Sequence, residues 1–478
     1  MSPTPALELH PDRLLPADPA QRDIARRLYT AVKGLPIISP HGHTDPRWFA
    51  DNRPFDNPAA LLVQPDHYLL RMLYSQGVSM EELGIPRGDG GPVTGKPVED
   101  DPRRVWRRFA GHYHLFRGTP SRMWLDHVFS EVFGLGQRLS ADTADLYFDT
   151  ISDCLQREAY LPRALFERFN IEVIATTESP LDDLRHHDRI LASGWPGRVI
   201  TAFRPDPVLD PEHEGFLSNL GQLAEITGES VDTFEGYLNA LRNRRDYFRK
   251  RGATSADHGH PTALTADLPP AEKRALYEKV RSGSQTPAEA ELFRGQMLTE
   301  MAAMSLEDGM VMQIHPGCYR NHNHSLFEHF GRDKGADIPV ATEYVRALRP
   351  LLNKFGNEPD LSLIVFTLDE TSYSRELAPL AGHYPALKLG PAWWFHDSPE
   401  GMRRYREQVT ETAGFYNTVG FNDDTRAFLS IPARHDVARR MDCAFLAQLV
   451  AEHRLPEDEA QELAVDLAYN LAKRAYKL

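Results

Sequence analysis

The stretch that decides the fold is Leu35-Pro-Ile-Ile-Ser-Pro-His-Gly-His-Thr-Asp45, a short apolar run that ends in two histidines one residue apart. In an extended backbone, side chains at positions i and i+2 point to the same side. His41 and His43 can therefore bind one ion together. Two imidazoles suit zinc or a similar divalent metal, which still needs a carboxylate or a third histidine. The alternative is a chance pair, since the chain has 20 histidines.

Seven further runs of strand-forming residues follow this one, and helical patterns separate them. One of these predicted helices covers residues 338–355, and another begins with a capping box at Thr286-Pro-Ala-Glu289. The eight predicted strands cover residues 36–43, 171–176, 198–203, 252–256, 310–314, 361–368, 386–392 and 416–421. This alternation predicts an α/β fold of the (β/α)8 barrel type, whose function lies at the carboxyl ends of the strands. The chemically reactive side chains fall there: His43, Glu178, Arg204, Asp257, His315, Asp369, Trp393 and Asp424. A doubly wound sheet is the alternative, but no glycine-rich phosphate turn follows the first strand.

The chain divides into three predicted parts. Residues 1–46 hold an N-terminal helix and the first barrel strand, and residues 166–478 hold the rest of the barrel and the C-terminal helices. Between them, residues 47–165 have a mostly helical, aromatic-rich pattern that is too long for a loop. We therefore expect a helical insertion after the first strand.

Composition limits the partners of this protein. The formal net charge of -14 disfavours nucleic acid, which binds to a basic face, but a small anionic substrate fits if a few arginines converge. Three cysteines without paired spacing predict a reducing, cytoplasmic location. No stretch approaches the length of a membrane span. The sequence leaves the oligomeric state open, a homo-oligomer included.

Barrel closure brings the ends of the first and last strands together. Asp424 is then a carboxylate ligand beside His41 and His43, which completes a site for one divalent metal with open positions. Asp423 is the rival for that role. His315 is either a further ligand or a hydrogen-bond donor to the substrate. Asp257, in place of a lysine, ends the fourth strand, so a second metal bridged by a carbamylated lysine is not expected.

Other side chains at the barrel mouth predict substrate contacts and proton transfer. Arginine forks bind carboxylates through two parallel hydrogen bonds, and three arginines follow different strands. An imidazole and a phenol in Asp66-His-Tyr68 could move protons between neighbouring carbons. Either tryptophan of Trp393-Trp394 could stack on a sugar. The arginines are Arg204, Arg320 and Arg426.

In these motifs the chain resembles the uronate isomerases, the glucuronate isomerase family of the amidohydrolase superfamily. The resemblance runs from the first strand nearly to the C-terminus. It rests on seven motifs in order: His41-Gly-His43, Asp66-His-Tyr68, Arg204-Pro-Asp206, Asp257-His258, His315-Pro-Gly-Cys-Tyr-Arg320, Trp393-Trp-Phe395 and Asp424-Thr-Arg-Ala-Phe-Leu-Ser430. The chain departs from the commoner pattern at Gly42, at Thr44-Asp45 and at Asn422-Asp423, which indicates a divergent branch.

The resemblance implies reversible conversion of D-glucuronate to D-fructuronate, and of D-galacturonate to D-tagaturonate, through a cis-enediol. It implies a metal, usually zinc, on His41, His43 and Asp424, and proton transfer by Asp424, His67 and Tyr68. It also implies that the substrate site is lined by Arg204, Asp257, His315, Arg320, Trp393 and Arg426. A metal-dependent hydrolase of a sugar-acid lactone or amide, and a non-catalytic sugar-acid binding barrel, are the alternatives that the sequence leaves open.

Overall fold

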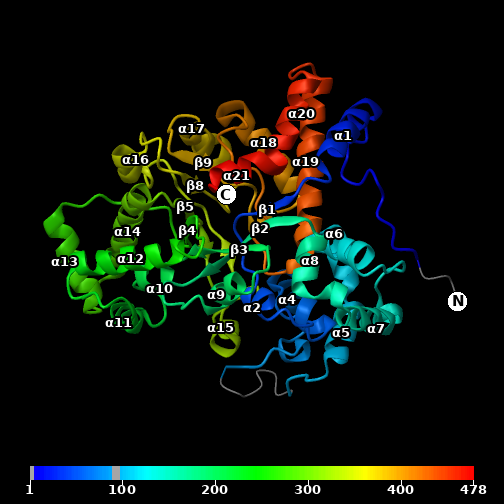
Figure 1. Cartoon of the computed structure of the whole chain (residues 1–478), viewed down its shortest axis with the longest axis horizontal. Helices are drawn as coiled ribbons and strands as arrows, with labels where there is room; N and C mark the ends of the chain where they lie inside the picture. Colours follow the sequence, from blue (N-terminus) through cyan, green and yellow to red (C-terminus); the bar gives the residue numbers. More distant parts are fainter. Residues whose placement is uncertain (1–4, 89–96) are drawn as a thin grey trace.

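The computed structural model describes residues 5–88 and 97–478. Residues 1–4 and 89–96, which belong to the first two predicted parts, lie outside the described residues. A curled parallel sheet of seven strands forms the centre (Figure 1). The strands are β1 (Ile37–Ser39), β2 (Ile171–Glu178), β3 (Arg198–Phe203), β4 (Ser255–His258), β5 (Val311–Ile314), β8 (Leu363–Val365) and β9 (Leu387–Leu389).

The strands of this sheet are hydrogen-bonded in the order in which they occur in the chain, β1-β2-β3-β4-β5-β8-β9, and each pair is parallel. A doubly wound sheet would reverse its strand order at a switch point. The continuous order is that of a (β/α)8 barrel, so the predicted fold class is confirmed and the doubly wound alternative is excluded.

The predicted eighth strand is reduced to one parallel bridge, between Thr418 and Leu389 of β9. The run cannot stay extended because Gly420 has a φ of +76° and packs against the C-terminal helices; a Cβ there would lie 2.9 Å from the carbonyl oxygen of Leu467. After this turn the chain returns to β1, where the His43 amide donates to the carbonyl oxygen of Thr425 over 3.1 Å. The mouth is therefore closed by a loop contact.

Helices pack against the outside of the sheet between its strands. Thr286 starts the longest of them through the predicted capping box: its hydroxyl accepts from the Glu289 amide at 3.2 Å, and Gly309 ends the helix in the left-handed region. The helices are α9 (Arg185–Ala192), α10 (Asp206–Leu209), α11 (Phe216–Thr227), α12 (Phe234–Arg249), α13 (Pro270–Arg281), α14 (Pro287–Asp308), α16 (Arg349–Phe355), α17 (Ala378–Ala381) and α18 (Pro399–Ala413).

One predicted helix, residues 338–355, is wrong over its first half. Ile338–Pro339 instead forms β7, which pairs antiparallel with β6 (Cys318–Tyr319). The hairpin encloses α15 (His324–Phe330). Asp337 holds the hairpin at its base, since its carboxylate accepts from the amide of Asn321 over 2.7 Å.

The chain between β1 and β2 is helical, and Figure 1 shows these blue to cyan helices gathered beside one part of the sheet. Their aromatic residues form a hydrophobic cluster that includes Trp106, Phe109, Tyr113 and Phe129 and extends to Phe428 after the last strand segment. The helices are α2 (Pro46–Asp51), α3 (Pro58–Leu62), α4 (His67–Ser75), α5 (Pro102–Gly111), α6 (Pro120–His127), α7 (Ala144–Leu155) and α8 (Pro162–Arg168).

The two ends of the chain pack together. Helix α1 (Pro19–Val32) packs on α19 (Ile431–Ala451) and α20 (Glu457–Val465), and α21 (Leu471–Ala475) follows. Within the described residues, no helix has both the length and the apolar character that crossing a membrane requires.

Replacing Leu363 by alanine tests the barrel core. The side chain is fully buried in β8, and truncating such a leucine costs about 2–5 kcal/mol of unfolding free energy. Urea unfolding followed by circular dichroism should show this loss. Leu191→Ala, at a leucine of α9 that is 62% exposed, is the matched control and should change stability by less than about 0.5 kcal/mol. Equal effects would contradict the placement of β8.

Candidate active site and metal centre

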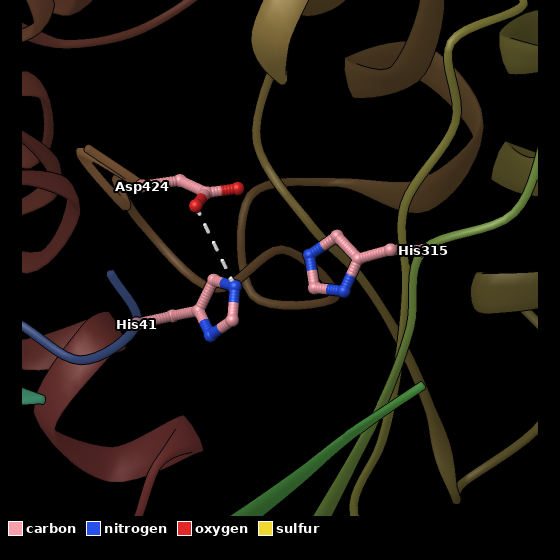
Figure 2. Close-up of side chains that lie close together, drawn as sticks. All are labelled: His41, His315 and Asp424. Carbon is pink, nitrogen blue, oxygen red and sulfur yellow. Dashed lines mark ion pairs between the residues drawn. The ribbon is translucent and has the colours of Figure 1, made fainter. Parts of the chain in front are cut away.

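Three side chains from distant parts of the chain meet at the barrel mouth. The ligand atoms of His41, His315 and Asp424 lie within 4.8 Å of one another (Figure 2). His41 Nε2 is 3.6 Å from Asp424 Oδ1, and the imidazoles of His41 and His315 stack with ring centroids 4.8 Å apart. This set of two nitrogens and one carboxylate suits a divalent transition metal.

His43 joins the same carboxylate from the other side. Its Nε2 lies 3.1 Å from Asp424 Oδ1, and its ring meets that of His41 edge-on at 5.3 Å. The structure therefore brings together the predicted trio of His41, His43 and Asp424. It also stacks His315 directly on His41, a contact that the sequence left open.

The environment of His315 leaves one ring nitrogen free for a ligand. Its Nδ1 lies 2.6 Å from Asp257 Oδ1, and its buried Nε2 has no hydrogen-bond partner. A carboxylate at Nδ1 fixes the tautomer, so that the lone pair of Nε2 points into the site. Asp257, predicted to contact substrate, is fully buried beside His315 and is not among the residues that line the cavity.

The protonation states of these groups fit a metal. Burial lowers the pKa of His41 to about 4, so its imidazole is neutral at neutral pH. Burial opposes ionisation of Asp424, but the imidazoles of His41 and His43 outweigh it and hold the pKa of that carboxyl well below its usual range. A metal requires neutral imidazoles and an ionised carboxylate. The donor set therefore fits a divalent cation.

Asp424, and not Asp423, faces the histidines. Asp424 has a φ of 37°, a left-handed conformation uncommon outside glycine, and its carboxylate lies against His41 and His43. Asp423 points away and accepts from His435 Nε2 at 3.0 Å. The indole N–H of Trp393 donates to Asp424 Oδ2 at 2.5 Å, and Trp393 is only 7% exposed. Its indole N–H thus binds the carboxylate, while its ring meets that of His315 edge-on, with centroids 4.7 Å apart, in the lining of the same cavity.

A buried polar network lies behind His41. Gln313, a polar residue inside the apolar strand β5, has its amide nitrogen 3.5 Å from His41 Nδ1. The Tyr476 hydroxyl donates to the oxygen of the Gln313 amide at 2.7 Å, and Tyr476, two residues before Leu478, is fully buried. The polar residue in an apolar run was a signal that sequence analysis missed; nothing marked Tyr476.

His67 and Tyr68 start helix α4 at the edge of the cavity. Asp66 caps this helix, accepting from the Tyr68 amide at 2.8 Å. The two rings stack with centroids 4.5 Å apart, and His67 Nε2 is buried without a partner. Burial lowers the pKa of His67 to about 3 and raises that of Tyr68 well above its usual value. Near pH 7 the site therefore holds a neutral imidazole and a protonated phenol.

Each of the three predicted arginines forms an ion pair with at least one aspartate. Arg204 is held on two sides, with Nε 2.9 Å from Asp206 and Nη1 3.1 Å from Asp257. Arg320 Nη1 is 3.1 Å from Asp337, and Arg426 Nη2 is 3.0 Å from Asp333. No motif in the sequence marked Asp333 or Asp337 as a partner of these arginines.

One cavity of about 980 Å³ collects nearly all of the predicted site residues. Of the predicted set, Asp257 alone is not in its lining. The lining includes His41, His43, His67, Tyr68, Arg204, His315, Arg320, Trp393, Asp424 and Arg426. The cavity thus combines a metal-ligand set, cationic forks and proton-transfer groups.

Comparison with known proteins gives the family. The sequence profile of the family described as glucuronate isomerase matches residues 19–476. The chain belongs to the glucuronate isomerase family. A uronate isomerase of Phenylobacterium zucineum is 69% identical over 99% of this chain and 98% of its own length. The crystal structure of glucuronate isomerase from Caulobacter crescentus is 64% identical, with a TM-score of 0.96, over 99% of this chain and 97% of that one. A Thermotoga maritima uronate isomerase is 27% identical, with a TM-score of 0.90, over 98% of this chain and 99% of that one. The resemblance found in the seven motifs is confirmed.

Glu178, which ends β2, is a further carboxyl group in this cavity. It is buried and accepts from the Thr201 hydroxyl, and His187 Nε2 lies 3.8 Å away. Burial raises the pKa of Glu178 to about 8, with small contributions in the same direction from Asp182 and Asp45. His187 is neutral there, since burial lowers its pKa to about 4.

Glu178 should make the protein less stable as the pH rises. A folded-state pKa of about 8 against an ordinary 4.5 means that the folded state binds the proton more tightly. Its contribution is full below pH 4.5 and is lost as the pH rises through about 8. Unfolding of wild type and Glu178→Gln should therefore diverge in favour of the variant across this window. Parallel pH curves would contradict a buried, protonated Glu178.

Removing His315 tests which side chains complete the metal site. We expect Asp424→Ala and His41→Ala to lose bound metal, and His315→Ala to lower metal affinity by about tenfold or more. Metal per chain, measured by mass spectrometry after dialysis against a chelator series, reports this directly. His324→Ala is the control, since that side chain is 81% exposed in α15. An unchanged affinity in His315→Ala would restrict the ligands to His41, His43 and Asp424.

Proposed function

We propose that this protein interconverts the aldose and ketose forms of hexuronates, D-glucuronate with D-fructuronate and D-galacturonate with D-tagaturonate. The observation that carries the proposal is one cavity that holds arginine forks together with an ionised carboxylate, a neutral imidazole and a protonated phenol. Membership of the glucuronate isomerase family supports it.

The arginines would hold the carboxylate of the sugar. Arg204 suits this role because Asp206 and Asp257 fix its guanidinium from behind. A fork held in place loses little freedom when it binds a carboxylate. We assign Asp257 a positioning role, behind both Arg204 and His315, in place of a substrate contact.

The chemical step would move one hydrogen from C2 to C1. A base removes the C2 proton while the C1 carbonyl oxygen gains a proton, which gives a cis-enediol; C1 is then protonated and the C2 hydroxyl loses its proton. Asp424 is ionised and suits the base, and the Tyr68 phenol suits the donor. His67, stacked on Tyr68, is the other candidate for either transfer. The arginine forks that do not bind the carboxylate would stabilise negative charge on the enediol.

The proposed cofactor is one divalent metal, with zinc as the favoured ion. His41, His43 and Asp424 would hold it, and the free Nε2 of His315 supports a fourth ligand. Such an ion would supply positive charge that orients hydroxyl and carbonyl oxygens of the sugar. Trp393 would keep Asp424 in the ligand conformation through its indole N–H.

The remaining proposals concern the setting of the enzyme. A cytoplasmic location is supported by three cysteines that are all unpaired and buried. We retain the division into residues 1–46, 47–165 and 166–478, supported by the helical character of the chain between β1 and β2. The partner proposed is a small hexuronate. Neither nucleic acid nor a membrane is proposed, and the protein could act as a homo-oligomer.

The metal-ligand set also favours a second candidate, hydrolysis of a sugar-acid lactone or amide. The two functions separate in a substrate panel of both uronates, their lactones and their amides, with ketose formation and acid release measured on the same protein. Ketose from the uronates, without acid release above background, is the expected result. Acid release without ketose would establish the hydrolase instead.

Tyr68→Phe tests proton transfer. Loss of a positioned acid typically lowers kcat by about 10²–10⁴. We expect this loss for both uronates with KM changed much less, since the ring and its packing remain. Tyr74→Phe is the matched control in the same helix, where the side chain is 41% exposed, and should keep wild-type kcat. A wild-type rate in Tyr68→Phe would remove the phenol from the mechanism.

A further inference from the structure

The segment between β6 and β7 lies over the active-site cavity. Its two ends are joined by the short antiparallel pairing of Tyr319 with Ile338. Several of its residues line the cavity, among them Arg320, Asn321, Asp333 and Asp337. This hairpin segment therefore forms one wall of the site.

Two aspartates of the hairpin segment contact two of the cavity arginines in different ways. Asp337 is 6% exposed, forms an ion pair with Arg320 and accepts a hydrogen bond from the amide of Asn321. Its role is therefore to stabilise the hairpin. Asp333 lies in the open part of the cavity wall, where its side chain and that of Arg426 are each 40% exposed. Asp333 Oδ2 is 3.0 Å from Arg426 Nη2.

The backbone holds Asp333 in that position. Asp333 has a φ of 63°, and the flanking Gly331 and Gly335 have φ of 75° and 79°. Gly335 packs directly on the start of α4, where a Cβ would lie 2.7 Å from the carbonyl oxygen of His67. The carboxylate of Asp333 is thus presented to Arg426 by a turn fastened to the helix that bears His67 and Tyr68.

Asp333 offers Arg426 the same chemical group that a uronate would offer. From this geometry we propose that Asp333 is a specificity-determining residue, an internal carboxylate that competes with the substrate's carboxylate for Arg426. An ion pair this exposed is weak in water, so a ligand anchored elsewhere in the cavity can displace it. A small carboxylate that has no further anchor gains too little to do so.

This inference rests on the proposed function, because it takes a hexuronate as the ligand. It predicts that replacing Asp333 changes the affinity for substrate in the opposite direction to the loss of a structural contact. Losing a structural contact weakens substrate binding, whereas losing a competitor strengthens it. Removing one negative charge beside Arg426 and Arg320 also favours an anion in the cavity.

Asp333→Asn is the test, with Glu328→Gln as a charge-matched control in α15 of the same segment, where Glu328 is 56% exposed. We expect the KM for D-glucuronate to fall by about two- to fivefold with little change in kcat. Inhibition by acetate should strengthen by a similar factor, and Glu328→Gln should match wild type. An unchanged or higher KM in a folded Asp333→Asn would overturn the inference.

Binding of D-glucarate, followed by calorimetry, separates this inference from the proposed function. Glucarate carries carboxylates but no aldehyde to isomerise, so its affinity reports the competition without turnover. Tighter glucarate binding in Asp333→Asn, with neither protein converting a uronate, would sustain the competition and refute the isomerase. Wild-type turnover with unchanged glucarate affinity in both Asp333→Asn and Asp333→Ala would refute the competition alone.

Discussion

The contact on which the rest of the site depends is the burial of the Asp424 carboxylate between two imidazoles and an indole N–H. Removing a charged carboxylate from water is costly unless opposite charge or hydrogen bonds compensate. Here His43 lies 3.1 Å away and Trp393 donates at 2.5 Å. Because these groups come from the segment after β1 and from the loop after β9, satisfying Asp424 also fixes how the barrel mouth closes. The amide of His43, bonded to the Thr425 carbonyl, completes that closure.

Much of this arrangement could be predicted because strands have simple rules. His41 and His43 share a side by their i, i+2 spacing, and parallel strands bring their carboxyl ends together. Those rules place Asp424 and His315 at the same mouth of the barrel. They also separated the barrel from a doubly wound sheet, which the strand order confirms.

The parts of the fold and the site that the sequence did not predict depend on tertiary contacts, which local sequence patterns do not encode. The eighth strand is lost because Gly420 turns against the C-terminal helices, a tertiary contact. Asp257 lies within β4, where its carboxylate contacts His315 and is not part of the cavity lining. Tyr476 reaches Gln313 from the far end of the chain. The aspartates beside Arg320 and Arg426 come from a hairpin whose second strand, β7, falls where the sequence pattern predicted the start of a helix at residue 338.

The pairing of every predicted arginine with an aspartate explains how a strongly acidic chain can favour an anion locally. Arg204 is held by two buried or nearly buried carboxylates, and Arg426 by an exposed one. The cavity therefore contains one guanidinium that is held in place, that of Arg204, and one whose aspartate partner a ligand can displace, that of Arg426. That division suits a substrate whose carboxylate must be held while the carbon atoms at the other end of the molecule change.

Conversion of D-glucuronate in deuterated water, followed by proton NMR, tests the isomerisation most directly. We predict that fructuronate forms and that any solvent deuterium in substrate and product is confined to C1 and C2, with Asp424→Asn inactive in the same assay. Deuterium at C5, or no ketose from either glucuronate or galacturonate by metal-loaded protein, would contradict proton transfer between C2 and C1.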